Sequence, residues 1–182
     1  MMKHLCILFF FFAVMNADAQ ENYAGTADAD DIGYWLGLGI GANYFGPTFH
    51  ASISVSRCDN IFTLRYLKAE EFRFNPGGGD YDSPALSMKE IGILYGRSLR
   101  KKYLTFSLSA GISTVSGTNR GKHIIYKQYE PQSMATFGVP FEAEFKIELS
   151  NSLAIGGAFF GDLNTKKSFT GGMAKISIGK FL

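Results

Sequence analysis

The chain has 182 residues and a formal net charge of +2 at pH 7, from 18 basic and 16 acidic side chains. A charge so close to zero gives no whole-chain argument for nucleic-acid binding, and no apolar segment after residue 20 reaches the length of a transmembrane helix. The 21 glycines, 17 phenylalanines and 9 tyrosines favour a β protein rich in glycine and aromatic residues.

The N-terminal residues have the three-part pattern of a secretory signal peptide. A basic start precedes an apolar run over residues 5–15, and small residues precede Gln20. We expect cleavage after Ala19, so that residues 1–19 are removed. A membrane anchor is the alternative, but the run is short for crossing a bilayer. Residues 20–32 are expected to form a flexible lead.

Residues 33–182 alternate between apolar and polar side chains with a period of two, which predicts β-strands with two unlike faces. The clearest strand, Phe137–Leu149, is long enough to cross a bilayer when tilted. With the seven strands listed next, the predicted total is eight, and an even number lets an antiparallel sheet close without unpaired edges. Seven further strands are predicted at Gly33–Tyr44, Thr48–Arg57, Asn60–Ala69, Met88–Ser98, Tyr103–Val115, Leu153–Leu163 and Phe169–Leu182.

The predicted connections differ in length between the two ends of the sheet. Tight turns are expected at Cys58–Asn60, Leu99–Lys102 and Ser150–Ser152. The other end carries long loops at Glu70–Ser87 and Ser116–Ala135, with shorter links at Phe45–Pro47 and Asn164–Ser168. Short periplasmic turns with longer external loops are typical of bacterial outer-membrane barrels. The sequence therefore predicts an all-β fold, an eight-stranded antiparallel up-and-down transmembrane β-barrel over residues 33–182.

The strand number, the two-residue repeat and the terminal strand Ile176–Leu182 resemble the OmpA-type and OmpX-type eight-stranded barrels of Gram-negative bacteria, within the porin-like outer-membrane proteins. Two features depart from that family: Leu182 follows Phe181 at the end, and Lys180 takes an outward position that is usually apolar or aromatic. The resemblance implies a protein of the cell outer membrane that the outer-membrane assembly machinery recognises. It also implies a structural, adhesive or envelope-maintenance role in the cell envelope.

Charged side chains fall at positions that the alternation assigns to the barrel interior. Because eight strands leave an interior only wide enough for side chains, we expect a paired polar plug and no open channel. Glu142 and Glu144 could instead form a carboxylate pair for acid and base catalysis, but nearby cations favour salt bridges. The predicted lumen network comprises Arg65, Glu90, Glu142, Glu144, Lys146, Glu148 and Lys175.

His50-Ala51-Ser52 is similar to the His-x-Ser element of the lipid A deacylases, which are eight-stranded outer-membrane enzymes. A histidine that activates a serine is a sound nucleophile design. Here Asn does not follow Ser52, no Glu lies at the corresponding distance, and both side chains fall on the inward face. We therefore expect no catalytic residue and no enzyme activity.

Metal and nucleotide sites are not expected either. After the signal the chain has one cysteine, Cys58, and two histidines, His50 and His123, which do not give zinc-type spacing. The acidic residues of the N-terminal lead lack the EF-hand pattern. The glycines of the first strand continue along a strand and not into a helix, as a dinucleotide fingerprint requires. No cofactor is predicted.

The two long loops are the better candidates for interaction, since a rigid barrel can present them at the cell surface. Their charged and aromatic residues could contact lipopolysaccharide phosphates or a surface protein; solvated loop charge with interfacial tyrosines is the alternative. Outer-membrane lipid is a further expected partner, and nucleic acid is not. The loop candidates are Asp80, Tyr81, Asp82, Arg120, Lys122, Tyr126 and Lys127.

Periodicity alone does not say which face of a strand lies inside. A soluble exported barrel of the lipocalin type, which binds an apolar ligand, would have the apolar face inside and the Glu142 face in water. The membrane barrel has the opposite arrangement. A barrel enzyme acting on lipid A is the third alternative, and it would require His50 and Ser52 to act together.

Overall fold

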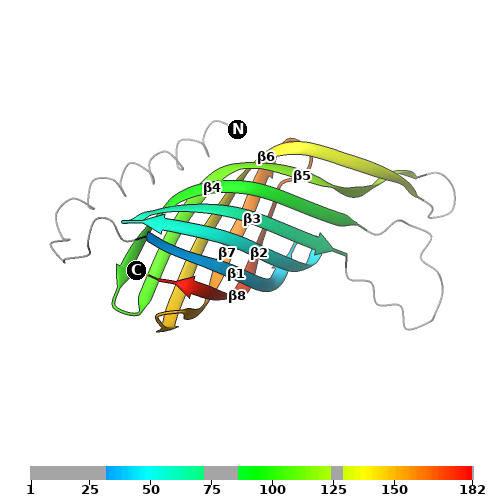
Figure 1. Cartoon of the computed structure of the whole chain (residues 1–182). Coiled ribbons are helices and arrows are strands. Elements are labelled where there is room, and N and C mark those ends of the chain that lie inside the picture. The colour runs from blue at the N-terminus through cyan, green and yellow to red at the C-terminus, as the bar shows by residue number, and fades with distance from the viewer. Residues whose placement is uncertain (1–31, 72–85, 124–128, 182) are drawn as a thin grey trace, which may run out of the picture.

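The chain folds into a closed β-barrel (Figure 1). The structure, a computed structural model, describes residues 32–71, 86–123 and 129–181. All eight strands pair antiparallel with their neighbours in sequence, and β1 closes the sheet by pairing with β8. The described part of the chain contains no helix that is long and apolar enough to span a membrane. The strands are β1 (Ile32–Asn43), β2 (Gly46–Arg57), β3 (Asn60–Glu70), β4 (Ser87–Lys101), β5 (Leu104–His123), β6 (Tyr129–Ser150), β7 (Leu153–Asn164) and β8 (Phe169–Lys180).

The two ends of the barrel differ as the predicted connections do. The turn end, where β1 begins and β8 finishes, has two-residue connections at 58–59, 102–103 and 151–152. Cys58 and Lys102, the first residues of two of these connections, have positive φ angles of 53° and 56°, as the first central residue of a type I′ or II′ hairpin turn does. The turn predicted at Leu99–Lys102 is shorter in the structure than expected, because β4 continues to Lys101. The loop end has connections at 44–45, 71–86, 124–128 and 165–168.

Strands β5 and β6 are longer than predicted, and the loop expected over Ser116–Ala135 is wrong in its extent. Their pairing continues from Ser116 opposite Ala135 to His123 opposite Tyr129, with an irregularity in between. Figure 1 shows this hairpin reaching beyond the neighbouring strands. Its outer part, residues 116–123 and 129–135, consists mostly of glycine, polar and charged residues, so no apolar alternation marks it as strand.

The outer wall of the barrel is apolar. A row of residues in direct register across four strands, Leu36, Ile53, Leu64 and Ile93, has exposed fractions between 49% and 59%. The residues that alternate with these along each strand point inward, and they include the buried Ser52, Ser54 and Arg65. This order, apolar outside and polar inside, contradicts the lipocalin-type alternative, which needs the apolar face inside.

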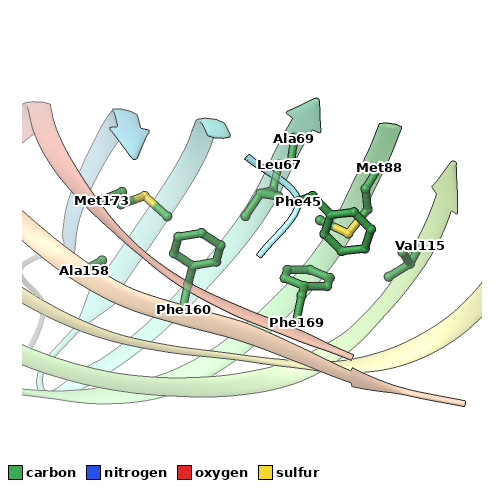
Figure 2. Close-up of a cluster of buried hydrophobic side chains, with 9 residues drawn as sticks. All are labelled: Phe45, Leu67, Ala69, Met88, Val115, Ala158, Phe160, Phe169 and Met173. Carbon is green, nitrogen blue, oxygen red and sulfur yellow. The ribbon is translucent and has the colours of Figure 1, made fainter. Parts of the chain in front are cut away.

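The interior is not polar throughout. At the loop end a cluster of buried apolar side chains fills the barrel (Figure 2). Phe45 lies in the β1–β2 connection and Phe169 begins β8, and their ring centroids are 6.3 Å apart. An apolar, filled region holds no water, and this end of the lumen is closed. The cluster comprises Phe45, Leu67, Ala69, Met88, Val115, Ala158, Phe160, Phe169 and Met173.

Candidate functional site

The candidate site lies in the middle of the lumen, where Arg65 crosses from β3 to the opposite wall. Its Nε and Nη2 atoms donate to Glu90 Oε1 at 2.9 and 2.6 Å. Its Nη1 donates to Glu142 Oε2 at 3.1 Å, and the guanidinium also reaches the main-chain oxygens of Phe141 and Gly161. Arg65 and Glu90 are fully buried. A planar guanidinium has five donors in a fixed fork, so one side chain joins β3, β4, β6 and β7.

Glu142 links this arginine to a second cation. Its Oε1 accepts from Lys175 Nζ at 2.6 Å, while its Oε2 lies 3.6 Å from His50 Nε2. Glu142 therefore faces Arg65, Lys175 and His50, which come from β3, β8 and β2. A buried carboxylate is tolerated when paired charges and hydrogen bonds replace its lost hydration.

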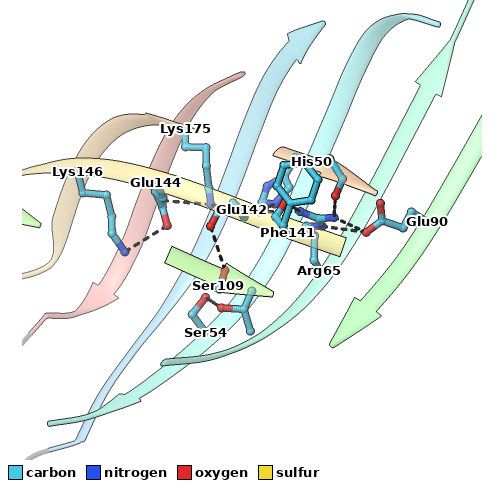
Figure 3. A network of polar contacts seen from close by, with 12 residues as sticks. His50, Ser54, Arg65, Glu90, Ser109, Phe141, Glu142, Glu144, Lys146 and Lys175 are labelled. Atoms are coloured by element: carbon cyan, nitrogen blue, oxygen red, sulfur yellow. Dashed lines mark hydrogen bonds and ion pairs between the residues drawn. The ribbon is translucent and has the colours of Figure 1, made fainter. Parts of the chain in front are cut away.

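The network continues toward the turn end through Glu144 and Lys146 (Figure 3). Lys175 Nζ lies 3.1 Å from Glu144 Oε1, and Lys146 Nζ lies 3.6 Å from Glu144 Oε2. The Lys146 ammonium is 3.8 Å from the ring centroid of Trp35. That ring packs on Phe181 with centroids 5.8 Å apart. The Lys146 ammonium and the rings of Trp35 and Phe181 close the lumen at this end. Phe181 therefore packs toward the interior, whereas Lys180 faces outward.

Six of the seven predicted lumen residues form this connected chain, and Glu148 lies apart from them. Glu148 is nearer the turn end, where Arg100 Nη2 donates to its Oε2 and Thr105 Oγ1 donates to its Oε1 at 2.9 Å. These two hydrogen bonds of Glu148 join β6 to β4 and β5 at the mouth of the barrel.

Asp162 belongs to the interior and was missed by sequence analysis. Its carboxylate is fully buried and accepts from Ser113 Oγ and, at 2.8 Å, from Asn164 Nδ2. The signal that could have found it is parity, because Asp162 has the same inward parity as Ala154, Ala158 and Phe160. The interrupted alternation of β7 hid this position.

A prediction follows from the space around Asp162. A Cβ added at Gly138 would lie closer to the Asp162 carboxylate than van der Waals contact allows. Gly138→Ala should therefore displace the carboxylate from Ser113 and lower the free energy of unfolding by about 1–3 kcal/mol, as urea denaturation in lipid vesicles would measure. The matched control is Gly172→Ala, whose Cβ would meet no atom nearer than 4.0 Å; an equal loss in both variants would contradict this account.

The geometry favours ion pairing over acid and base chemistry in this network. Both carboxylates of the pair considered for catalysis, Glu142 and Glu144, contact Lys175. The His50 and Ser52 side chains are buried in the lumen and do not lie on the outer wall. No group of His, Cys, Asp and Glu that could hold a metal ion is found in the described residues. In those ranges the buried ionic side chains are Arg65, Lys146, Lys175, Glu90, Glu142, Glu144 and Asp162.

Most of the predicted loop candidates lie outside the described residues. These are Asp80, Tyr81, Asp82, Tyr126 and Lys127. Arg120 and Lys122 belong to β5 and not to a loop, which corrects their predicted placement.

Solved structures show which proteins share this fold. No protein-family model and no curated protein matches the chain. The N-terminal barrel domain of Pseudomonas aeruginosa OprF matches with a TM-score of 0.58 at 11% identity, covering 81% of this chain and 96% of that one. Neisserial surface protein A matches with a TM-score of 0.55 at 11% identity, covering 82% and 96%. The fold is that of the eight-stranded outer-membrane β-barrels.

A third outer-membrane-type barrel gives the same result. The attachment invasion locus protein Ail of Yersinia pestis matches with a TM-score of 0.54 at 9% identity, covering 82% of this chain and 97% of that one. At such identities the likeness concerns the fold, including the strand number and the closure of β1 on β8.

Proposed function

We propose that this chain is an integral outer-membrane protein whose barrel is a rigid, occluded platform with a structural, adhesive or envelope-maintenance role. The observation that supports it is the outer wall: exposed Leu, Ile, Val and Phe side chains on every strand, around an interior that holds paired charges. In water so large an apolar surface would aggregate. In a bilayer it is the surface that the lipid chains require.

Trypsin treatment of intact cells tests this placement. The loop end should face the outside, so we expect cleavage at exposed Lys166 in the connection at 165–168 and protection of Lys101 and Lys102 at the turn end. Membranes opened by detergent serve as the control, because cleavage at exposed turns should then appear. Cleavage at Lys101 and Lys102 in intact cells, or recovery of the protein as a soluble periplasmic species, would contradict the proposal.

The barrel is proposed to conduct no ions, since both ends of its lumen are filled. The apolar cluster around Phe160 closes the loop end, and the Trp35, Lys146 and Phe181 side chains close the turn end. Purified protein inserted in a planar bilayer should give no stepwise conductance above the baseline. Regular conductance steps at moderate voltage would show that a path exists through the lumen, and the occlusion proposal would fail.

The projecting hairpin supports an adhesive role. The β4 partner of β5 ends opposite Thr118, and the β7 partner of β6 ends opposite Gly138, yet β5 and β6 stay paired to His123 and Tyr129. None of the described strands pairs with the two outer edges of this hairpin beyond these points, and such edges accept an extended partner. The proposed partners are lipopolysaccharide or a surface protein. Similarity to Ail, whose name describes attachment and invasion, is in keeping with this role.

A further inference from the structure

The inward face of β1 differs from that of the other strands around the lumen network. This strand is described over its whole length, and it contributes no inward charged or hydroxyl group. Gly37, Gly39 and Gly41 occupy its inward positions between Trp35 and Asn43. The barrel closes at this strand, because β1 pairs with β2 on one side and with β8 on the other. The seam of the barrel therefore lacks an inward polar side chain on its central strand.

Two serine hydroxyls flank this strand from its two neighbours. Ser52 of β2 and Ser177 of β8 are the direct neighbours of Gly37 in register, one on each side. Their exposed fractions are 5% and 1%, and neither Oγ has a hydrogen-bond partner among the described residues. Buried hydroxyls are in large majority hydrogen-bonded, either to the protein or to ordered water. Both hydroxyls thus require a partner at the same place on the wall.

The glycine between them provides the space for such a partner. A Cβ built on Gly37 would lie 2.5 Å from Ser52 Oγ, 3.6 Å from Lys175 Cε and 3.9 Å from Ser177 Oγ. Outside the adjoining chain, the Ser52 hydroxyl is therefore the only described atom within 3.6 Å of that position. Three side chains from β2 and β8 converge over Gly37, and the missing side chain leaves room for a small group between them.

The charges around this space decide which small group fits. The Lys175 ammonium is already paired with Glu142 Oε1 at 2.6 Å and with Glu144 Oε1 at 3.1 Å. Apart from His50, the buried ionic side chains of the described ranges are three cations and four carboxylates. An anion would meet this excess of negative charge, and a metal ion would lie close to an ammonium group. Hydroxyls both donate and accept hydrogen bonds, so an uncharged molecule that does the same is the matching ligand.

We propose that a water molecule is bound over Gly37, where it forms hydrogen bonds with Ser52 Oγ and Ser177 Oγ. This water joins β2 to β8 across β1 and replaces the inward polar side chain that β1 lacks. Buried waters that satisfy otherwise unpartnered polar groups are an integral part of protein structures. The lumen is filled at both of its ends, so the water should exchange slowly with solvent. The site concerns the interior alone and does not depend on the membrane placement.

A crystal structure of the full-length protein, at a resolution that shows ordered water, tests the site. We expect a peak within hydrogen-bond distance, about 2.5–3.0 Å, of both serine hydroxyls. The double variant Ser52→Ala with Ser177→Ala removes both partners of the water and should lack the peak. The matched control is Ser54→Ala with Thr63→Ala. It removes two lumen hydroxyls that bond to each other at 2.9 Å, and it should keep the peak.

A second measurement uses the wild-type protein in lipid nanodiscs. Magnetisation transfer from water to Gly37, measured by nuclear magnetic resonance, should have the sign of a bound water and should be lost in the Ser52 and Ser177 double variant. Gel mobility without boiling reports whether each variant is a folded barrel. Serine hydroxyls that turn to main-chain oxygens, with no peak between them and no transfer to Gly37, would overturn the proposal. A bromide peak over Gly37 in soaked crystals would also overturn it, because the ligand would then be an anion.

Discussion

Arg65→Ala is expected to lower the free energy of unfolding by about 3–5 kcal/mol, because it leaves buried carboxylates without their cation. Glu90 accepts two hydrogen bonds from this guanidinium, at 2.6 and 2.9 Å, and Glu142 loses one of its two closest cations. The variant also loses the hydrogen bonds that hold β3 to β6 and β7 across the lumen. Urea denaturation in lipid vesicles, followed by gel mobility without boiling, measures the change.

Two controls separate this effect from a general loss of charge. Arg65→Ala combined with Glu90→Gln removes one of the carboxylates left without a cation, and it should restore part of the lost free energy of unfolding. Lys68→Ala breaks an exposed ion pair at the rim and should leave the denaturation midpoint unchanged, since exposed pairs contribute little. If Arg65→Ala behaved like Lys68→Ala, the lumen network would not support the barrel as described.

Leu64→Arg is expected to destabilise the membrane-inserted barrel by about 2–4 kcal/mol, the range for a basic residue at the bilayer midplane. Leu64 is 49% exposed in the middle of the apolar row, between Ile53 and Ile93. The free energy of unfolding from vesicles again reports the change. If this wall faced water, the same substitution would change the free energy of unfolding by no more than about 0.5 kcal/mol, as surface substitutions usually do.

Depth provides the control for this prediction. Tyr103 is 70% exposed in the β4–β5 turn, beyond the apolar band. Tyr103→Arg should therefore lower the free energy of unfolding by only about 0–1 kcal/mol, as basic residues near the membrane–water interface do. Equal effects at Leu64 and Tyr103 would mean that the wall has no depth profile and does not face a bilayer.

The alternation of side chains predicted the apolar parts of the eight strands and grouped their side chains into two faces. Each strand buries one face against the interior, so a period of two assigns Glu142, Glu144 and Lys146 to the same side. The contacts across the lumen could not be predicted in this way. That Arg65 meets Glu142, 77 residues later, depends on barrel closure and on the reach of one long side chain.

Other features were hidden because the alternation was interrupted or polar. The outer parts of β5 and β6 have few apolar residues, so strand and loop give the same signal there. Phe45 and Phe169 lie at strand ends, where periodicity stops, yet they complete the apolar cluster that closes the loop end. Gly161 and Asp162 follow Phe160 in a strand of weak alternation, which concealed a buried carboxylate.

The most direct test of the membrane barrel is gel mobility of the purified protein refolded into phospholipid vesicles, with and without boiling. The account predicts that the protein enters the vesicles, resists extraction with carbonate, and runs as a compact band that shifts to the unfolded position only after boiling. A protein that stays in the aqueous phase and runs at one position under both conditions would contradict it.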